Sequence, residues 1–166
     1  MDKSEQIVNS HRMEWTQEQE HGERFAFKRK TLSRKSGGKN LGCSLFQVPP
    51  GKTAFPFHLH YSNEEAIYIL KGKGSLRLGE KTFAVETGDY IALPVGKDHP
   101  HQLINNSDSM LEYLCLSTMK FPEVAEYPDS GKVGVMTGSA PPGAGVKTGL
   151  LRLFDQSATL DYYDGE

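Results

Sequence analysis

Apolar and polar positions alternate in short runs between residues 41 and 119, and clusters of Pro, Gly, Asn and Asp separate the runs. Alternation with a period of two is typical of strands that bury one face. Many such runs with frequent turn signals predict an all-β protein, either an antiparallel sandwich or a barrel. The expected strands are 41–48, 54–60, 65–70, 75–78, 82–85, 90–93, 101–105 and 111–117.

The pattern changes on both sides of this block. Residues 1–23 are hydrophilic and acid-rich, whereas 24–39 hold seven basic residues and no acidic one, so we expect a polar arm followed by a solvated edge strand and loop. After the block, 121–132 indicate an ordered tail, and the Pro/Gly-rich 138–149 a flexible loop. Residues 150–154 are expected to form a last strand or a helical turn. The interpretation is one domain, with an N-terminal arm and edge strand over 1–40, a core over 41–120 and a packing tail over 121–166.

Composition and charge exclude several classes of function. A chain of 166 residues is long enough for one core, and a net charge of −2 gives no general attraction for nucleic acid or an anionic membrane. The N-terminus lacks the apolar segment of a signal peptide, and no apolar run approaches the ~18 residues of a membrane span. We therefore expect a cytoplasmic protein.

Cys43 and Cys115 lie in apolar runs without metal or redox spacing, and are interpreted as small buried hydrophobic residues that stay reduced.

The candidate chemistry begins with a His-x-His pair in one expected strand. His58 and His60 are two residues apart, so their side chains share a face about 6.6 Å apart at the backbone, close enough to converge on one metal ion. Glu65 opens the next strand with the parity of Ile67 and Ile69, which places its carboxylate inside the barrel. A carboxylate in an apolar interior is costly unless a positive charge receives it, and a metal ion answers that need.

A second segment brings another imidazole to the same region. Residues 88–105 contain a turn, an apolar strand and a Pro-Val-Gly turn, followed by two histidines, His99 and His101. Three imidazoles and one carboxylate would leave one or two exchangeable positions on a six-coordinate metal ion. At this point either histidine can be the third.

Together the two segments resemble the motifs of the cupin superfamily. The first motif maps onto Gly51, His58, His60, Glu65 and Gly72, and the second onto Gly88, Pro94, Gly96, a histidine and Asn105. The resemblance implies a cupin barrel, also called a jelly roll or double-stranded β-helix, with N- and C-terminal extensions. The flanking segments are also similar to bacterial single-domain cupins often labelled sugar-phosphate isomerases. One departure is minor: six residues rather than five separate Gly51 from His58.

The second departure concerns the histidine of the second motif. His99 keeps the usual distance from Gly96, whereas His101 keeps the usual gap to Asn105. Pro100 interrupts strand pairing between them, so His99 belongs more naturally to the turn and His101 to the strand. The resulting hypothesis is one divalent transition metal ion (Zn, Mn, Fe or Ni among others) on His58, His60, Glu65 and His101, with His99 near the pocket mouth.

Three functions fit such a centre. In the favoured one the metal acts as a Lewis acid in a sugar or sugar phosphate isomerase, where Glu64, His99 or Tyr61 supplies a base. Lys52, Arg77 and Lys97 are the candidates for binding a phosphate. The alternatives are an Fe(II)-dependent dioxygenase and a non-catalytic barrel that binds a small molecule. Because small cupins are commonly dimers, the resemblance also implies a homodimer, with a small molecule as the other partner.

Overall fold

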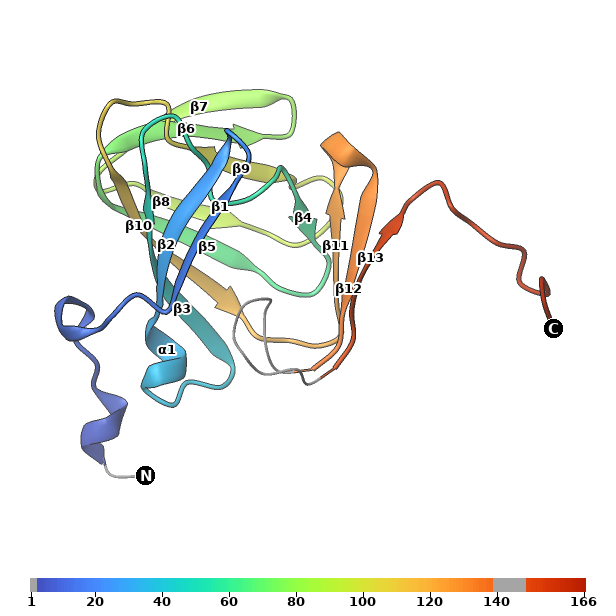
Figure 1. The fold of residues 1–166 in the computed structure, drawn as a ribbon, viewed down its shortest axis with the longest axis horizontal. Coiled ribbons are helices and arrows are strands. Elements are labelled where there is room, and N and C mark those ends of the chain that lie inside the picture. The colour runs from blue at the N-terminus through green and yellow to red at the C-terminus, as the bar shows by residue number, and fades with distance from the viewer. Residues whose placement is uncertain (1–2, 139–148) are drawn as a thin grey trace.

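The computed structural model describes residues 3–138 and 149–166 and is built almost entirely of antiparallel strands (Figure 1). The strands are β1 (Gln17–His21), β2 (Phe25–Thr31), β3 (Leu41–Val48), β4 (Leu59–His60), β5 (Glu65–Lys71), β6 (Lys73–Leu78), β7 (Lys81–Glu86), β8 (Tyr90–Leu93), β9 (His101–Ile104), β10 (Leu111–Thr118), β11 (Glu123–Tyr127), β12 (Lys132–Met136) and β13 (Leu151–Asp155). One short helix, α1 (Leu32–Lys35), and the 3-10 turns Lys3–Gln6, Ser10–Arg12 and Pro128–Ser130 complete the described elements.

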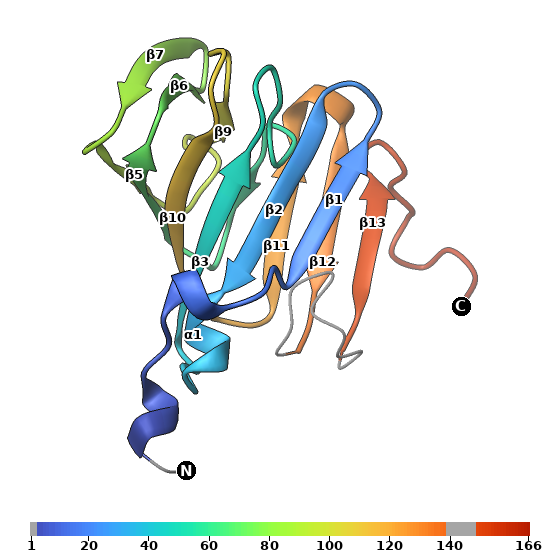
Figure 2. The same cartoon turned by 60° about the vertical axis from the view of Figure 1, so that its left-hand side comes forward.

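The strands form three sheets. The largest has the order β1-β2-β3-β10-β5-β8, and sheets of order β7-β6-β9 and β13-β12-β11-β4 lie against it (Figure 2). The core cluster is drawn from both the largest and the three-stranded sheet, with Phe46, Ile69, Leu76 and Leu103 among its buried members. Non-local pairing of this kind is what the alternating pattern predicts: each strand buries its apolar face against the opposite sheet.

The central expectations for the strands are confirmed. The runs at 41–48 and 90–93 form β3 and β8 with the expected bounds, and the other central runs differ by one or two residues at their ends. The exception is 54–60, of which only β4 is regular strand, while Thr53 and His58 make isolated bridges. Residues 150–154 resolve to a strand, β13, and the expected loop at 138–149 lies largely outside the described residues.

The basic stretch was expected to be a solvated edge strand, and this is wrong for its first half. β2 lies between β1 and β3, and the edge of the sheet is β1. Ala26 and Phe27 of β2 are buried. β1 carries no apolar signal in the sequence, because its five residues are all polar, and four of the five are exposed at the edge of the sheet.

The two cysteines are free, as expected, but only partly buried. Cys115 packs against the core cluster, and burial raises the pKa of its thiol well above the ordinary value. Among the described residues, no helix has the length and apolar character that a membrane span needs.

Candidate metal centre

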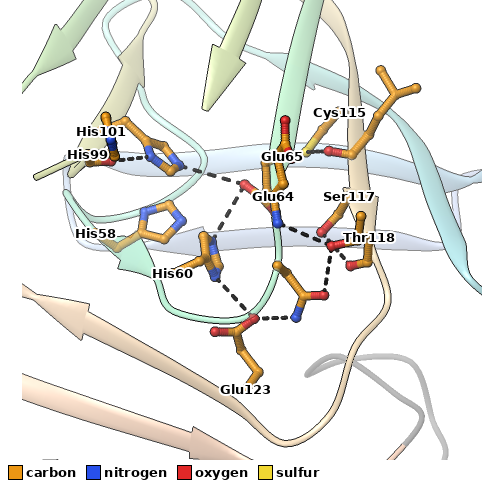
Figure 3. Close-up of polar contacts among 12 residues, drawn as sticks. His58, His60, Glu64, Glu65, His99, His101, Cys115, Ser117, Thr118 and Glu123 are labelled. Carbon is orange, nitrogen blue, oxygen red and sulfur yellow. Dashed lines mark hydrogen bonds and ion pairs between the residues drawn. The ribbon is translucent and has the colours of Figure 1, made fainter. Parts of the chain in front are cut away.

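Four side chains from three separate segments converge at one end of the barrel (Figure 3). His60 is the last residue of β4, Glu65 the first of β5 and His101 the first of β9. His58, just before β4, pairs with His101 through two backbone hydrogen bonds: the His58 N–H donates to the His101 carbonyl at 3.1 Å, and the His101 N–H donates back at 2.8 Å. Strand pairing therefore brings residues 43 positions apart in the chain into contact.

The donor atoms of these four side chains have a common focus. One ligand atom from each of His58, His60, Glu65 and His101 lies within 4.8 Å of all the others. The Glu65 carboxylate stands 3.5 Å from Nε2 of His60 and 3.6 Å from Nε2 of His101. These separations are too long for good hydrogen bonds, but suit two ligands on a shared ion with bonds of about 2.1 Å.

Backbone carbonyls fix the orientation of two of the imidazoles. The carbonyl of Pro56 lies 2.8 Å from Nδ1 of His58, and the carbonyl of His99 lies 3.1 Å from Nδ1 of His101. A carbonyl accepts only, so Nδ1 carries the proton in each ring and the lone pair stays on Nε2. That tautomer is the one that a metal ligand needs.

The chemistry of the donor set fits a metal ion. Nδ1 and Nε2 of His60 and Nε2 of His101 are buried and have no hydrogen-bond partner. A buried polar atom without a partner costs about 1–3 kcal/mol, so proteins rarely leave three of them together. A divalent transition ion at the focus would satisfy His60 and His101 through one nitrogen each and would compensate the Glu65 charge.

Electrostatics keep two of the four side chains, Glu65 and His58, in the protonation state that binds metal. Burial raises the pKa of Glu65, but the neighbouring His101 and His60 outweigh burial and hold the pKa well below its usual range. Burial and the adjacent His101 and His60 lower the pKa of His58 to about 3. Glu65 is thus ionised and His58 neutral at neutral pH, as a carboxylate ligand and an imidazole ligand must be.

Glu123 is a buried carboxylate behind His60 that sequence reasoning missed. It is 2% exposed and lies 3.9 Å from Nδ1 of His60. Its oxygens accept hydrogen bonds from the backbone N–H groups of Tyr61 and Ser62 and from the side-chain amide of Asn63. Figure 3 shows Glu123 beside His60. Because β11 pairs with β4, the tail supplies the support for the His-x-His strand. A carboxylate at Nδ1 of a ligand histidine orients the ring and raises its basicity.

The three residues expected to supply a base lie outside this focus. The Tyr61 hydroxyl donates to Glu126 at 2.8 Å, and the ring is 43% exposed. Glu64 is exposed, in keeping with its opposite parity to Glu65. The exposed His99 lines a small surface pocket with Asp98 and Pro94, and its backbone carbonyl, not its ring, reaches His101. Their catalytic roles stay predictions.

The candidates for binding a phosphate are also directed elsewhere. Lys52 donates to the backbone carbonyl of Glu23, and Arg77 pairs with Asp129 at 2.7 Å while its guanidinium lies over Phe57. Lys97 is exposed in the loop before β9.

Residues 44–117 match the model of the cupin domain. The chain contains a cupin domain. The match spans β3 to β10 and includes all four residues of the focus.

Solved structures extend the likeness beyond the cupin domain. The chain superimposes on a "putative sugar phosphate isomerase" from Acidithiobacillus ferrooxidans with a TM-score of 0.79, 23% identity and coverage of 96% of this chain and 98% of that one. A sugar phosphate isomerase of the cupin superfamily from Silicibacter pomeroyi gives a TM-score of 0.69, 21% identity and coverage of 83% and 82%. At these identities the likeness establishes a shared fold that includes the extensions.

A sequence relative points to another chemistry. The chain is 31% identical to quercetin 2,3-dioxygenase from Bacillus subtilis over 96 residues, which are 55% of this chain and 28% of the relative. The matched segments cover 28% and 54% of the two curated relatives, so neither likeness extends to a whole relative.

Proposed function

We propose that this cupin holds one divalent transition metal ion on His58, His60, Glu65 and His101 and acts on a small oxygen-rich substrate bound at that ion. The observation that carries the proposal is the set of buried imidazole nitrogens without partners, aimed at an ionised carboxylate. Four protein ligands leave one or two positions on a six-coordinate ion for a substrate.

The proposed reaction is the isomerisation of a small sugar or sugar phosphate. When bound, a metal ion supplies Lewis-acid chemistry that polarises a carbonyl oxygen. The chain contributes a fixed set of donors, with the ring orientations of His58 and His101 set by backbone carbonyls. Isomerisation also needs a group that moves a proton between carbons. Glu65, the described carboxylate at the focus, is a proposed ligand and its lowered pKa makes it a weak base, so that group must be another one, for which Glu64, His99 and Tyr61 remain the predicted candidates.

A second candidate is an Fe(II)-dependent dioxygenase. It is favoured by the identity of 31% to a quercetin 2,3-dioxygenase over 55% of this chain. The same donor set can serve iron, and the open positions would then take substrate and dioxygen.

The experiment that separates these reactions starts with elemental analysis of protein purified without added metal. Oxygen uptake is then measured with quercetin and with catechols, and aldose–ketose conversion is measured with a panel of small sugar phosphates. Zinc or manganese with isomerase turnover supports the first proposal, and iron with oxygen uptake supports the second. Failure of both reactions by metal-loaded protein, with a small molecule that still raises the melting temperature, would replace both with a binding module.

A further inference from the structure

Arg29 is a cation on the inner face of the largest sheet. In β2 it shares parity with the buried Phe27, whereas Lys28 faces outward and pairs with Glu18 at 2.9 Å. The guanidinium carbon of Arg29 lies 5.4 Å from the centre of the Phe46 ring, and Nε donates to the Ser44 hydroxyl at 3.1 Å. Phe46 is 2% exposed and Ser44 is 6% exposed, so both contacts hold the side chain against the core.

Most of the hydrogen-bonding capacity of Arg29 is unused. A guanidinium carries five N–H donors, and within the described part of the chain only Nε has a hydrogen-bond partner. No carboxylate of a described residue lies within 4.0 Å of it. The terminal nitrogens are absent from the buried polar atoms without partners, so they are open to solvent and to a ligand. The planar fork that recognises carboxylate and phosphate groups is therefore free.

The strand register relates Arg29 to Glu65 of the proposed metal centre. Ser44, its hydrogen-bond partner, stands opposite Cys115 in the register of β3 and β10. Two residues further along β10, Ser117 stands opposite Glu65. Cys115 and Ser117 share a strand face, because side chains alternate along β10. Burial lowers the pKa of the Arg29 guanidinium, and the charge of Glu65 acts in the opposite direction.

The summed charge of Arg29, the two carboxylates and the proposed metal ion favours an anionic ligand. A dication at the focus and Arg29 would bring three positive charges, against the two carboxylates of Glu65 and Glu123. Arg34 of α1 adds a further repulsion on Arg29. Arg29 is partly buried, and a partly buried cation gains more from a paired anion than a fully exposed cation does.

We propose that Arg29 forms the anion-binding subsite of the barrel and receives a phosphate or carboxylate group of a substrate whose oxygen atoms reach the metal. This inference rests on the proposed function, because it takes the metal centre as the other end of the same site. It assigns the role to a residue that differs from the three surface cations suggested by sequence.

The test uses metal-loaded protein and three variants: Arg29→Gln, Arg29→Lys and Lys28→Gln. Lys28→Gln is the matched control, since it removes the same charge from the opposite face of the same strand. The dissociation constants of inorganic phosphate and acetate are measured by calorimetry, with glycerol as a neutral probe. Arg29→Gln should weaken binding of phosphate by about tenfold or more, the loss expected for a charge-assisted hydrogen bond. Lys28→Gln should leave the dissociation constant of phosphate within about twofold of the wild-type value.

The conservative variant tests the geometry. Arg29→Lys keeps the charge but loses the planar fork, and we expect phosphate binding about threefold or more weaker than in the wild type. If Arg29→Gln lowers the melting temperature, Arg29→Lys carries the comparison. The inference is overturned if phosphate binds the Arg29 variants as tightly as the wild type. It is also overturned if Lys28→Gln weakens phosphate binding as much as Arg29→Gln does.

Metal content per chain, measured on the same samples, separates this inference from the proposed function. A full metal site with phosphate affinity unaffected by Arg29→Gln would remove the subsite and leave the metal centre. If the wild type holds no metal and its phosphate affinity still falls in Arg29→Gln, the anion-binding subsite is retained and the metal centre is rejected.

Discussion

The two histidines of the second motif, which Pro100 separates, have different roles in the structure. His101 turns Nε2 toward Glu65, whereas His99 offers its backbone carbonyl to the His101 ring. A backbone carbonyl is present whatever the side chain, so His99→Ala should keep metal content within about twofold of the wild type. His101→Ala removes a ligand, and we expect a loss of metal affinity of at least tenfold. Metal per chain after dialysis checks the ranking; the reverse order would mean that the wrong histidine was assigned.

The depressed pKa of His58 predicts a pH dependence of stability in chelator-treated protein. The pKa is lowered from 6.5 to about 3, so between these values the unfolded chain binds a proton that the native chain does not. The free energy of unfolding should therefore fall as the pH falls below about 6.5, by at most about 1.4 kcal/mol per pH unit from this group. The pKa of His60 is raised above 6.5. Its contribution to the free energy of unfolding is therefore present below about pH 6.5 and is lost as the pH rises above that value.

Urea unfolding from about pH 6 to about pH 5 isolates the His58 contribution, since Glu65 begins to affect stability only below about pH 4.5. His58→Gln should show a shallower slope than the wild type over this interval. Equal slopes would mean that His58 takes up its proton normally in the native state.

At the scale of elements, one motif glycine holds a turn that another residue cannot adopt. Gly72, between β5 and β6, has φ of 89°, and a Cβ there would stand 2.5 Å from the Met110 carbonyl oxygen. Gly72→Ala should destabilise the protein by about 1–3 kcal/mol. Gly79 is the matched control: its φ is also positive at 55°, but no atom lies within 4 Å of an added Cβ. Denaturant unfolding should show the larger loss at Gly72; equal losses would contradict the steric account.

The strands that sequence could predict are those whose pattern is set by burial. β8 alternates between exposed and buried residues, and β3 alternates between buried and partly buried residues from Ser44 on, so their bounds follow from the sequence. β1 and β12 were missed for different reasons. β1 has no apolar residue, and its existence depends on pairing with β2. β12 begins at the last residue of 121–132, the stretch interpreted only as an ordered tail, and it forms because β11 and β13 flank it.

The residues of the metal site also differ in whether the sequence could predict their place. His58, His60 and Glu65 could be grouped from strand parity alone, because the three lie within one hairpin-sized segment. Glu123 and Arg29 could not, since each reaches the interior through a strand pairing that no local spacing encodes. Glu123 depends on β11 lying beside β4, and Arg29 on β2 lying inside the sheet rather than at its edge.

For the whole molecule, the outer strand of the four-stranded sheet indicates an interface. β13 is an edge strand, and Leu153 and Phe154 are 57% and 51% exposed. The following segment carries Leu160 and Tyr162, which are 84% and 87% exposed, and it leaves the barrel as an extended tail (Figure 1). Exposed apolar edges favour association. We expect a homodimer, with a mass by light scattering of twice the 18.4 kDa of one chain. A mass of one chain at micromolar concentration would contradict this.

The account depends most on four side chains sharing one metal ion. The direct measurement is the metal content per chain of protein purified without added metal, compared with His60→Ala and Glu65→Gln. We predict close to one transition metal ion per wild-type chain and a large loss in both variants, because each removes one of the donors at the focus. A metal-free wild type that cannot be loaded, or full occupancy in both variants, would contradict the account.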